Sequence, residues 1–200
     1  MHDFDAQRLY LYFTASTMSD VEYLRSQLIA HPDFPKKGIV FLDIFPLLRN
    51  PLAFETLITH FLHRITSHTI PKSSSKKIDV IVGLDARGFL LGPILALRLG
   101  AAFVPVRKKG KLPGQCVSAT YEKEYGSDVF EMQADAIKSG QSIVIVDDLI
   151  ATGGSAKAAG ELVAKQGGKT LEYLFIIELM FLKGGENLDA PVYSIVQSDD

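Results

Sequence analysis

The chain has 200 residues, which is enough for one domain with a buried core. Its formal net charge of -2 gives no electrostatic reason to expect a nucleic acid or an anionic membrane surface as its partner. Cys116 is the one cysteine, which excludes an internal disulfide and any site built from several cysteines, and favours a cytoplasmic location. No apolar run approaches the roughly 20 residues of a membrane helix. We therefore expect a single domain that binds a small molecule.

The N-terminal third predicts two helices with a loop between them. Apolar residues recur at helical spacing from Met18 to Ala30, and a second helix is expected from Leu52 to Ser67. Residues 31–43 contain two prolines and a glycine, so we expect a loop that leads into a short extended piece at Ile39 to Phe41. The polar segment from Pro71 to Lys77 is typical of a surface linker.

From residue 78 onward, short apolar runs alternate with helical patterns. The apolar runs are residues 78–84, 101–106, 142–146 and 171–179, and the helical patterns are residues 89–99 and 155–166. Such uninterrupted runs favour strands that are buried on both faces. Their alternation with helices predicts an α/β fold with a mainly parallel central sheet flanked by helices. Ligands of such folds bind at the carboxyl ends of the strands, so the chemistry is expected there.

The segment IVIVDDLIATGGS, residues 143–155, has the features of a phosphate site. Gly153 and Gly154 allow the backbone to curl until several N–H groups converge at the start of the next helix. The helix dipole favours an anion at the same place. Thr152 and Ser155 add hydroxyl donors, and no lysine follows the glycines, which excludes the GxxxxGK[ST] loop of nucleoside triphosphatases.

Two adjacent carboxylates, Asp147 and Asp148, precede this phosphate site. They would repel a polyphosphate bound beside them. They suit hydrogen bonds from the hydroxyl groups of a ribose whose own 5-phosphate occupies the phosphate site. The alternative is that the pair only ends a strand and caps a helix, because aspartate is common in both places. The complete segment favours the first interpretation, a site for a ribose 5-phosphate.

The same segment resembles the diphosphoribosyl-binding signature of the type I phosphoribosyltransferases. Further segments resemble the adenine phosphoribosyltransferases, in the same order and at similar spacing, from about Asp33 to Gly184. They read DFPKKGIVFLDIFPLLRNP, VGLDARGFLLGP, VPVRKKGKLPG, ATYEKEYGSD and FLKG. The resemblance implies the type I phosphoribosyltransferase-like fold in one domain, residues 18–200, with a small N-terminal hood at about 31–50 and a core at about 78–182. Residues 1–17 fall outside it, as a disordered extension or an alternative start.

The reaction that the resemblance implies belongs to purine salvage. The 5-phosphoribosyl group of phosphoribosyl diphosphate moves to N9 of adenine, giving AMP and diphosphate. The resemblance also implies a homodimer and assistance by Mg²⁺, held mainly by substrate and water with no direct protein ligand. The whole loop would then bind phosphoribosyl diphosphate and AMP, so Ala151 joins the binding residues.

Basic residues follow the first two strands of the core. Arg87 comes after the run that ends at Leu84, where it would meet either the diphosphate or the base; the alternative is a surface ion pair. A cluster after the next strand consists of Arg107, Lys108, Lys109 and Lys111. By itself it would be a solvated face. In the family, matching basic residues reach the diphosphate, partly across a dimer interface.

The long polar segment from Gly110 to Gly126 has the size of an active-site lid. Departure of diphosphate from the anomeric carbon builds an oxocarbenium-like centre that has to be sheltered from water. By resemblance, Glu124 accepts a proton from the purine imidazole and Tyr125 helps to cover the site. An unperturbed glutamate is ionised at neutral pH, as this role requires. The alternative is a solvated hairpin glutamate.

The base site is predicted from apolar residues. A flat purine needs apolar faces and a few polar groups at its edge, which Ile39, Val40 and Leu149 would provide together with Arg87. Plain core packing is the alternative for each apolar side chain. Relatives that select 6-oxopurines place a lysine near the strand after the motif helix, and the run LEYLFIIEL has none.

Two positions depart from the family pattern, and two other functions compete with it. Leu42 stands where many relatives carry a charged residue, and Ala86 where many carry serine, so the polar contacts of the hood and of the loop at residue 85 are open. A regulator that senses the nucleotide or phosphoribosyl diphosphate on the same fold would need a DNA-binding module, and the roughly thirty residues before the hood lack basic character. A Mg²⁺-dependent phosphoryl-transfer domain would leave the lid unexplained.

Overall fold

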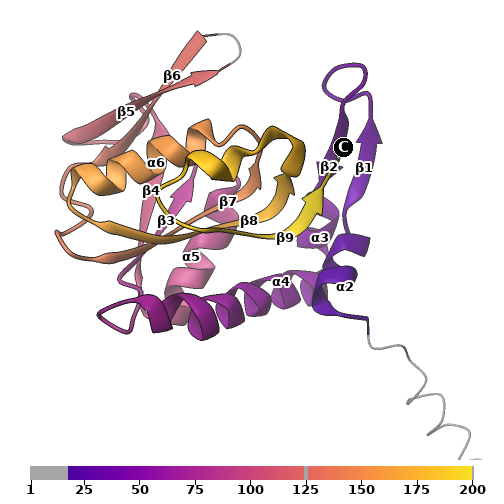
Figure 1. Ribbon diagram of the computed structural model, residues 1–200, viewed down its shortest axis with the longest axis horizontal. Helices are drawn as coiled ribbons and strands as arrows, with labels where there is room; N and C mark the ends of the chain where they lie inside the picture. The colour runs from indigo at the N-terminus through magenta and orange to yellow at the C-terminus, as the bar shows by residue number, and fades with distance from the viewer. Residues whose placement is uncertain (1–17, 124–125, 200) are drawn as a thin grey trace, which may run out of the picture.

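A computed structural model describes residues 18–123 and 126–199 of the chain. The main strands are β3 (Val80–Leu84), β4 (Ala102–Lys108), β5 (Cys116–Lys123), β6 (Gly126–Gln133), β7 (Ser142–Ile150), β8 (Lys169–Leu179) and β9 (Val192–Ser198). They form a seven-stranded sheet in the order β5-β6-β4-β3-β7-β8-β9 (Figure 1). Strands β4, β3, β7, β8 and β9 are parallel, whereas β6 is antiparallel to both β4 and β5. The expected mainly parallel sheet is confirmed.

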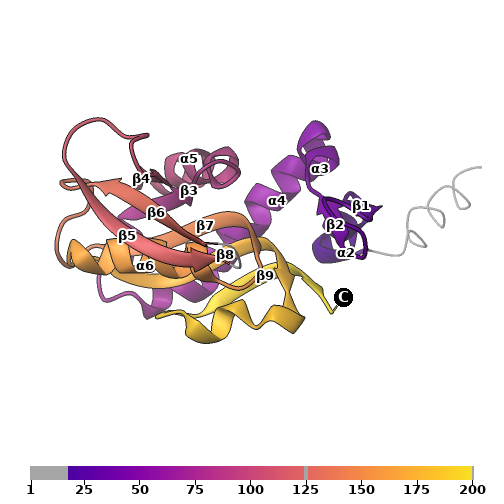
Figure 2. The ribbon, with the colours of Figure 1, turned by 90° about the horizontal axis from the view of Figure 1, so that it is seen from above.

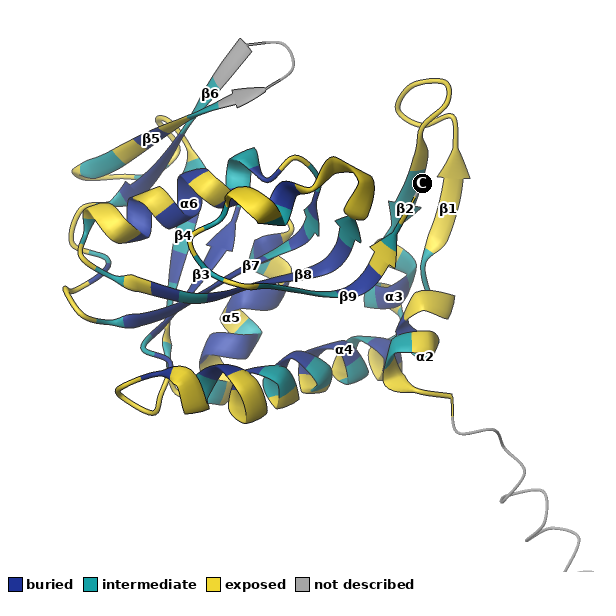
Figure 3. Ribbon diagram, in the orientation of Figure 1, coloured by how far each residue is buried: buried dark blue, intermediate teal, exposed yellow. Residues whose placement is uncertain are grey.

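Helices cover both faces of this sheet, as the view from above shows (Figure 2). Helices α4 (Pro51–Arg64) and α5 (Gly88–Leu99) pack on one face in a core with β7, β8 and β9. Helix α6 (Gly154–Lys165) packs on the other face, in a second core that includes residues of β5 and β6. All five residues of β3 are buried, as expected of a strand covered on both faces (Figure 3). The two layers leave the strand ends accessible.

The N-terminal part forms a small subassembly beside the sheet (Figure 1). Its elements are α2 (Asp20–Ser26), β1 (Ile29–Pro32), β2 (Val40–Asp43) and α3 (Phe45–Arg49). Ser19 and Glu22 form a capping box at the start of α2. The predicted helix Met18 to Ala30 was therefore too long. The extended piece predicted at Ile39 to Phe41 corresponds to β2, whereas β1 was not predicted. Antiparallel pairing of β1 with β2 replaces the last helical turn, and this long-range contact is not visible in a helical pattern.

Three further segments can be compared with the prediction from the sequence. Helix α4 continues as a π-helix (Ile65–Thr69) and a 3₁₀ turn (Ile70–Lys72), close to the expected helix 52–67. The segment expected as a lid, residues 110–126, contains strand β5, which pairs with β6 in a hairpin. Strand β9 was not predicted. In the part of the chain that the structure describes, no helix is long and apolar enough to cross a membrane.

Candidate active site

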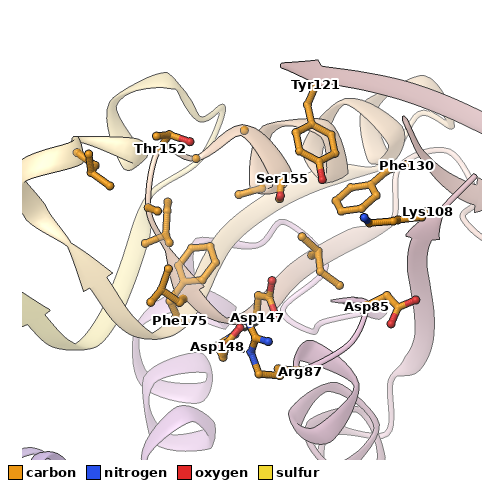
Figure 4. A pocket seen from close by; sticks show the side chains of 18 residues that line it. Asp85, Arg87, Lys108, Tyr121, Phe130, Asp147, Asp148, Thr152, Ser155 and Phe175 are labelled. Carbon is orange, nitrogen blue, oxygen red and sulfur yellow. Dashed lines mark hydrogen bonds and ion pairs between the residues drawn. The ribbon is translucent and has the colours of Figure 1, made fainter. Parts of the chain in front are cut away.

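A cavity of about 590 Å³ lies at the carboxyl ends of β3, β4 and β7, where the α/β fold predicts a ligand (Figure 4). Its wall consists of Leu84, Asp85, Arg87, Lys108, Tyr121, Phe130, Asp147, Asp148, Leu149, Ile150, Ala151, Thr152, Gly153, Gly154, Ser155, Ala156, Phe175 and Leu182. Every residue of the predicted phosphate segment from Asp147 to Ser155 is in this wall. A cavity of this size is in the range of small-molecule sites.

The phosphate loop, residues 151–155, follows β7 and includes the first two residues of α6. Gly153 has a φ of 81°, a conformation that glycine adopts without strain, and it occupies the N-cap position of α6. It has no side chain to cap the helix, so the first N–H groups of α6 are available to a ligand. Thr152 and Ser155 place hydroxyl groups in the same wall. The arrangement is an anion site at the start of a twelve-residue helix.

The acidic pair lies at the end of β7, beside Arg87 (Figure 4). Asp148 is buried, and its Oδ2 atom accepts a hydrogen bond from Nε of Arg87 over 2.5 Å. The backbone N–H of Asp148 donates to Oδ1 of Asp147 over 3.0 Å. Burial and the neighbouring Asp148 carboxylate raise the pKa of Asp147 well above its usual value. Two carboxylates and one arginine therefore lie together at the end of β7, and ionisation of both carboxylates is disfavoured there.

Arg87 occupies the N-cap position of α5, directly after the loop that follows β3. The peptide bond between Asp85 and Ala86 in that loop is cis. The Arg87 side chain is 46% exposed, so its guanidinium contacts both the Asp148 carboxylate and the space of the cavity. Both expected roles, toward diphosphate or toward base, are compatible with this position. The partner Asp148 is buried in the cavity wall, so the pair is not the surface ion pair of the alternative interpretation.

The basic cluster after β4 divides into two parts. Lys108 lines the cavity and pairs with Asp128 of β6 over 3.1 Å. Arg107 instead pairs with Asp85 over 2.8 Å and donates to the backbone carbonyl of Lys111 over 3.1 Å. Neither Arg107 nor Lys111 belongs to the cavity wall. Of the predicted diphosphate ligands in this cluster, the structure thus brings only Lys108 to the site.

The predicted catalytic pair, Glu124 and Tyr125, lies outside the described residues. The flanking strands β5 and β6 are described, and they carry Tyr121 and Phe130 into the cavity wall with ring centroids 4.7 Å apart. These two aromatic residues were not predicted. Alternation of apolar and polar residues in the hairpin was the available signal, because it marks which side chains share a face.

The predicted adenine residues are not gathered in one place. Leu149 lies in the cavity wall. Ile39 and Val40 are 45% and 49% exposed on or beside the two-stranded sheet and are not in that wall. Leu42, the departure from the family pattern, packs against the core. Phe175 and Leu182 line the cavity and were missed, because a phenylalanine inside a buried strand gives no signal of function.

Comparison with known proteins agrees with this geometry. Residues 49–196 match the model of the phosphoribosyl transferase domain. The chain belongs to the type I phosphoribosyltransferase family. It is 56% identical over 177 residues to the adenine phosphoribosyltransferase of Yarrowia lipolytica, covering 88% of this chain and 95% of that one. It is 53% identical over 183 residues to adenine phosphoribosyltransferase 1 of Saccharomyces cerevisiae, covering 92% and 96%.

Solved structures of phosphoribosyltransferases confirm the fold. The Saccharomyces cerevisiae adenine phosphoribosyltransferase, complexed with an imino-altritol bisphosphate and adenine, superimposes with a TM-score of 0.83 at 55% identity, covering 88% of this chain and 98% of that chain. The Trypanosoma brucei enzyme, in complex with AMP, pyrophosphate and ribose-5-phosphate, gives a TM-score of 0.79 at 26% identity, covering 93% and 84%. The resemblance noted in the sequence is confirmed, and the chain is an enzyme of this family.

Proposed function

We propose that this chain transfers the 5-phosphoribosyl group from phosphoribosyl diphosphate to N9 of adenine, giving AMP and diphosphate in purine salvage. One observation carries the proposal: a single cavity contains the phosphate loop, the acidic pair and Arg87. A phosphate site alone would fit many enzymes. Its combination with two carboxylates and a cation fits a substrate that is a sugar with a phosphate at one end and a charged leaving group at the other.

The phosphate loop is assigned to the 5-phosphate. Backbone N–H groups at the start of α6 and the hydroxyls of Thr152 and Ser155 donate to its oxygens. Asp147 and Asp148 then accept hydrogen bonds from the ribose hydroxyls. Their position at the end of β7, just before the loop, supports an arrangement in which the sugar lies next to the phosphate. This assignment orients the anomeric carbon toward the remaining cavity.

The diphosphate is assigned to the basic groups. Arg87 and Lys108 stand in the cavity wall, and positive charge there stabilises the departing diphosphate. Arg107 and Lys111 stand outside that wall, so we assign them to the cavity of a second subunit in a homodimer. Exposed apolar side chains on α5 support a dimer, because Leu90 and Leu97, two helical turns apart, are 39% and 81% exposed on one side of the helix.

The residues of the cavity fit Mg²⁺ bound mainly through the substrate. Mg²⁺ prefers oxygen ligands and is commonly held by one or two carboxylates, phosphate oxygens and water. The wall offers the carboxylate pair Asp147 and Asp148, and among the described residues no group of three His, Cys, Asp or Glu side chains is arranged as a metal site. When bound, the ion would neutralise charge on the diphosphate. A cytoplasmic location stays a prediction from the sequence.

Base and proton transfer are assigned to the hairpin and the hood. Glu124 accepts the proton lost from the purine imidazole, and Tyr125 covers the site. Leu149 offers an apolar face to the ring, with Ile39 and Val40 as the predicted opposite face. Tyr121 of β5 and Phe130 of β6 support this assignment, because both side chains line the cavity.

One assay tests the proposal. The protein is incubated with phosphoribosyl diphosphate and Mg²⁺ together with adenine, hypoxanthine, guanine or orotate, and diphosphate release is measured. We expect release with adenine. Release with hypoxanthine but not adenine would overturn the base assignment, and no release with any base would favour the regulator on the same fold.

A further inference from the structure

The backbone that follows β8 packs directly against the phosphate loop. The chain leaves β8 through two 3₁₀ turns, η3 (Met180–Leu182) and η4 (Gly184–Asn187). Gly184 is buried, and a Cβ atom built there would overlap the carbonyl oxygen of Ala151 and lie 2.7 Å from the backbone N of Gly153. A Cβ atom built on Gly153 would in turn overlap the carbonyl oxygen of Gly184. The two backbones therefore meet with no room for a side chain between them.

This contact matters because part of the phosphate loop lies outside the regular elements. Pairing of β7 with β8 ends at Ile150, and α6 begins at Gly154, so residues 151–153 belong to neither element. A backbone atom of each of these three residues lies within 3 Å of a Cβ atom built on Gly184 of η4. The N–H groups of an anion site must converge within a few tenths of an ångström to donate to the same phosphate.

We infer that Gly184 is a positioning residue for the reaction: its lack of a side chain lets η4 support the phosphate loop in the shape that binds a 5-phosphate. The inference rests on the proposed function, since it concerns the phosphate that phosphoribosyl diphosphate and AMP share. Adenine carries no phosphate. A disturbance of this contact should therefore weaken the binding of both phosphorylated ligands and leave adenine recognition unchanged.

The test compares Gly184→Ala with Gly185→Ala. The added methyl at 184 meets backbone atoms that cannot move without displacing the loop, whereas the methyl at 185 meets Cγ2 of Val192 at 3.2 Å, the end of a side chain. Calorimetry with AMP and steady-state kinetics are run on both. For Gly184→Ala we expect the Kd for AMP and the KM for phosphoribosyl diphosphate to rise at least about tenfold, with the KM for adenine changed less than about twofold. Gly185→Ala should match wild type.

An unchanged AMP affinity in folded Gly184→Ala would overturn the inference, and so would an equal loss for adenine and AMP. If Gly184→Ala does not fold, Leu188→Ala replaces it. Leu188 follows η4 and packs against the second core, so its truncation lets the turn recede from the loop, and the same selective loss of AMP affinity is expected. Wild-type protein that neither binds AMP nor turns over would instead contradict the proposed function.

Discussion

The guanidinium of Arg87 covers the buried carboxylate of Asp148, with Nε and Oδ2 2.5 Å apart. Arg87 arises from the loop after β3 and Asp148 from the end of β7, and these two strands are neighbours in the sheet. The pair thus joins the predicted diphosphate side of the cavity to the predicted ribose side. Substrate binding has to accommodate the acidic pair and this cation together.

Replacement of Arg87 should therefore affect both halves of the site. We expect Arg87→Ala to raise the KM for phosphoribosyl diphosphate by about tenfold or more, because the substrate's negative charge would then face Asp147 and Asp148 without a compensating cation. Steady-state kinetics measure this. Arg98→Ala, at the other end of α5 in a surface pair with Glu55, is the control and should leave the KM unchanged. Wild-type kinetics in Arg87→Ala would remove the side chain from the site.

The raised pKa of Asp147 predicts that its replacement by a neutral residue increases stability and weakens substrate binding. Its pKa in the folded protein lies above the unfolded value of about 3.9, so ionisation destabilises the fold. This cost is absent below the unfolded pKa and develops as the pH rises toward the folded pKa. Asp147→Asn keeps the Oδ1 acceptor for the Asp148 N–H and should raise the free energy of unfolding by roughly 1 kcal/mol at neutral pH, while it weakens binding of the ribose.

Denaturant unfolding at neutral and acidic pH measures this effect. The gain of Asp147→Asn should shrink as the pH falls, because wild-type Asp147 is then protonated as well. Asp148→Asn is the matched control: it weakens the ion pair with Arg87, so no gain is expected. A gain of Asp147→Asn that does not depend on pH would show that ionisation of Asp147 is not its cause.

Much of the core and of the phosphate site could be predicted, because both depend on local sequence. Apolar runs predict buried strands, and the glycine pair with its neighbouring hydroxyls predicts a loop that binds phosphate. Every residue from Asp147 to Ser155 lies in the cavity wall. Gly184 could not be assigned a role in the same way. Its contact with Ala151 joins segments more than thirty residues apart, and a sequence shows a glycine without showing which backbone approaches it.

The parts that were missed depend on pairing between segments. Residues 29–32 have no strong strand pattern and become β1 only because Val40–Asp43 lies beside them. The hairpin β5–β6 was expected only as a polar lid segment, because the pairing of its two strands is a contact that the order of residues does not show. The sequence also could not show that Lys108, and not Arg107, lines the cavity. The two side chains pair with Asp128 and Asp85, which come from other elements.

A buried ion pair away from the cavity should affect the stability of the fold but not catalysis. Glu172 is 2% exposed; its Oε1 atom accepts from Nε and Nη2 of Arg64 at 3.0 and 2.6 Å, and its Oε2 atom accepts from the hydroxyl of Thr69. Glu172→Ala leaves both donors without this acceptor and should lower the free energy of unfolding by about 3 kcal/mol. Thermal and denaturant unfolding measure it. The kcat at a temperature where the variant is folded should stay near that of wild type.

Glu55 provides the comparison, because its pair with Arg98 is exposed. Glu55→Ala should change the free energy of unfolding by less than about 1 kcal/mol. Equal losses in the free energy of unfolding for the two variants would mean that burial does not increase the contribution of the Glu172 ion pair to stability.

The hairpin tip carries the prediction on which the chemistry depends. Glu124 was assigned as proton acceptor by resemblance and lies outside the described residues, so kinetics must test it. We expect Glu124→Ala to lower kcat by about 10² or more, the usual effect of losing an acid-base group, with the Kd for AMP little changed. Glu122→Ala, on the same hairpin, is the control and should retain kcat. A Glu124→Ala variant with wild-type kcat would remove this residue from the mechanism, and the purine proton would then need an acceptor such as solvent or the departing diphosphate.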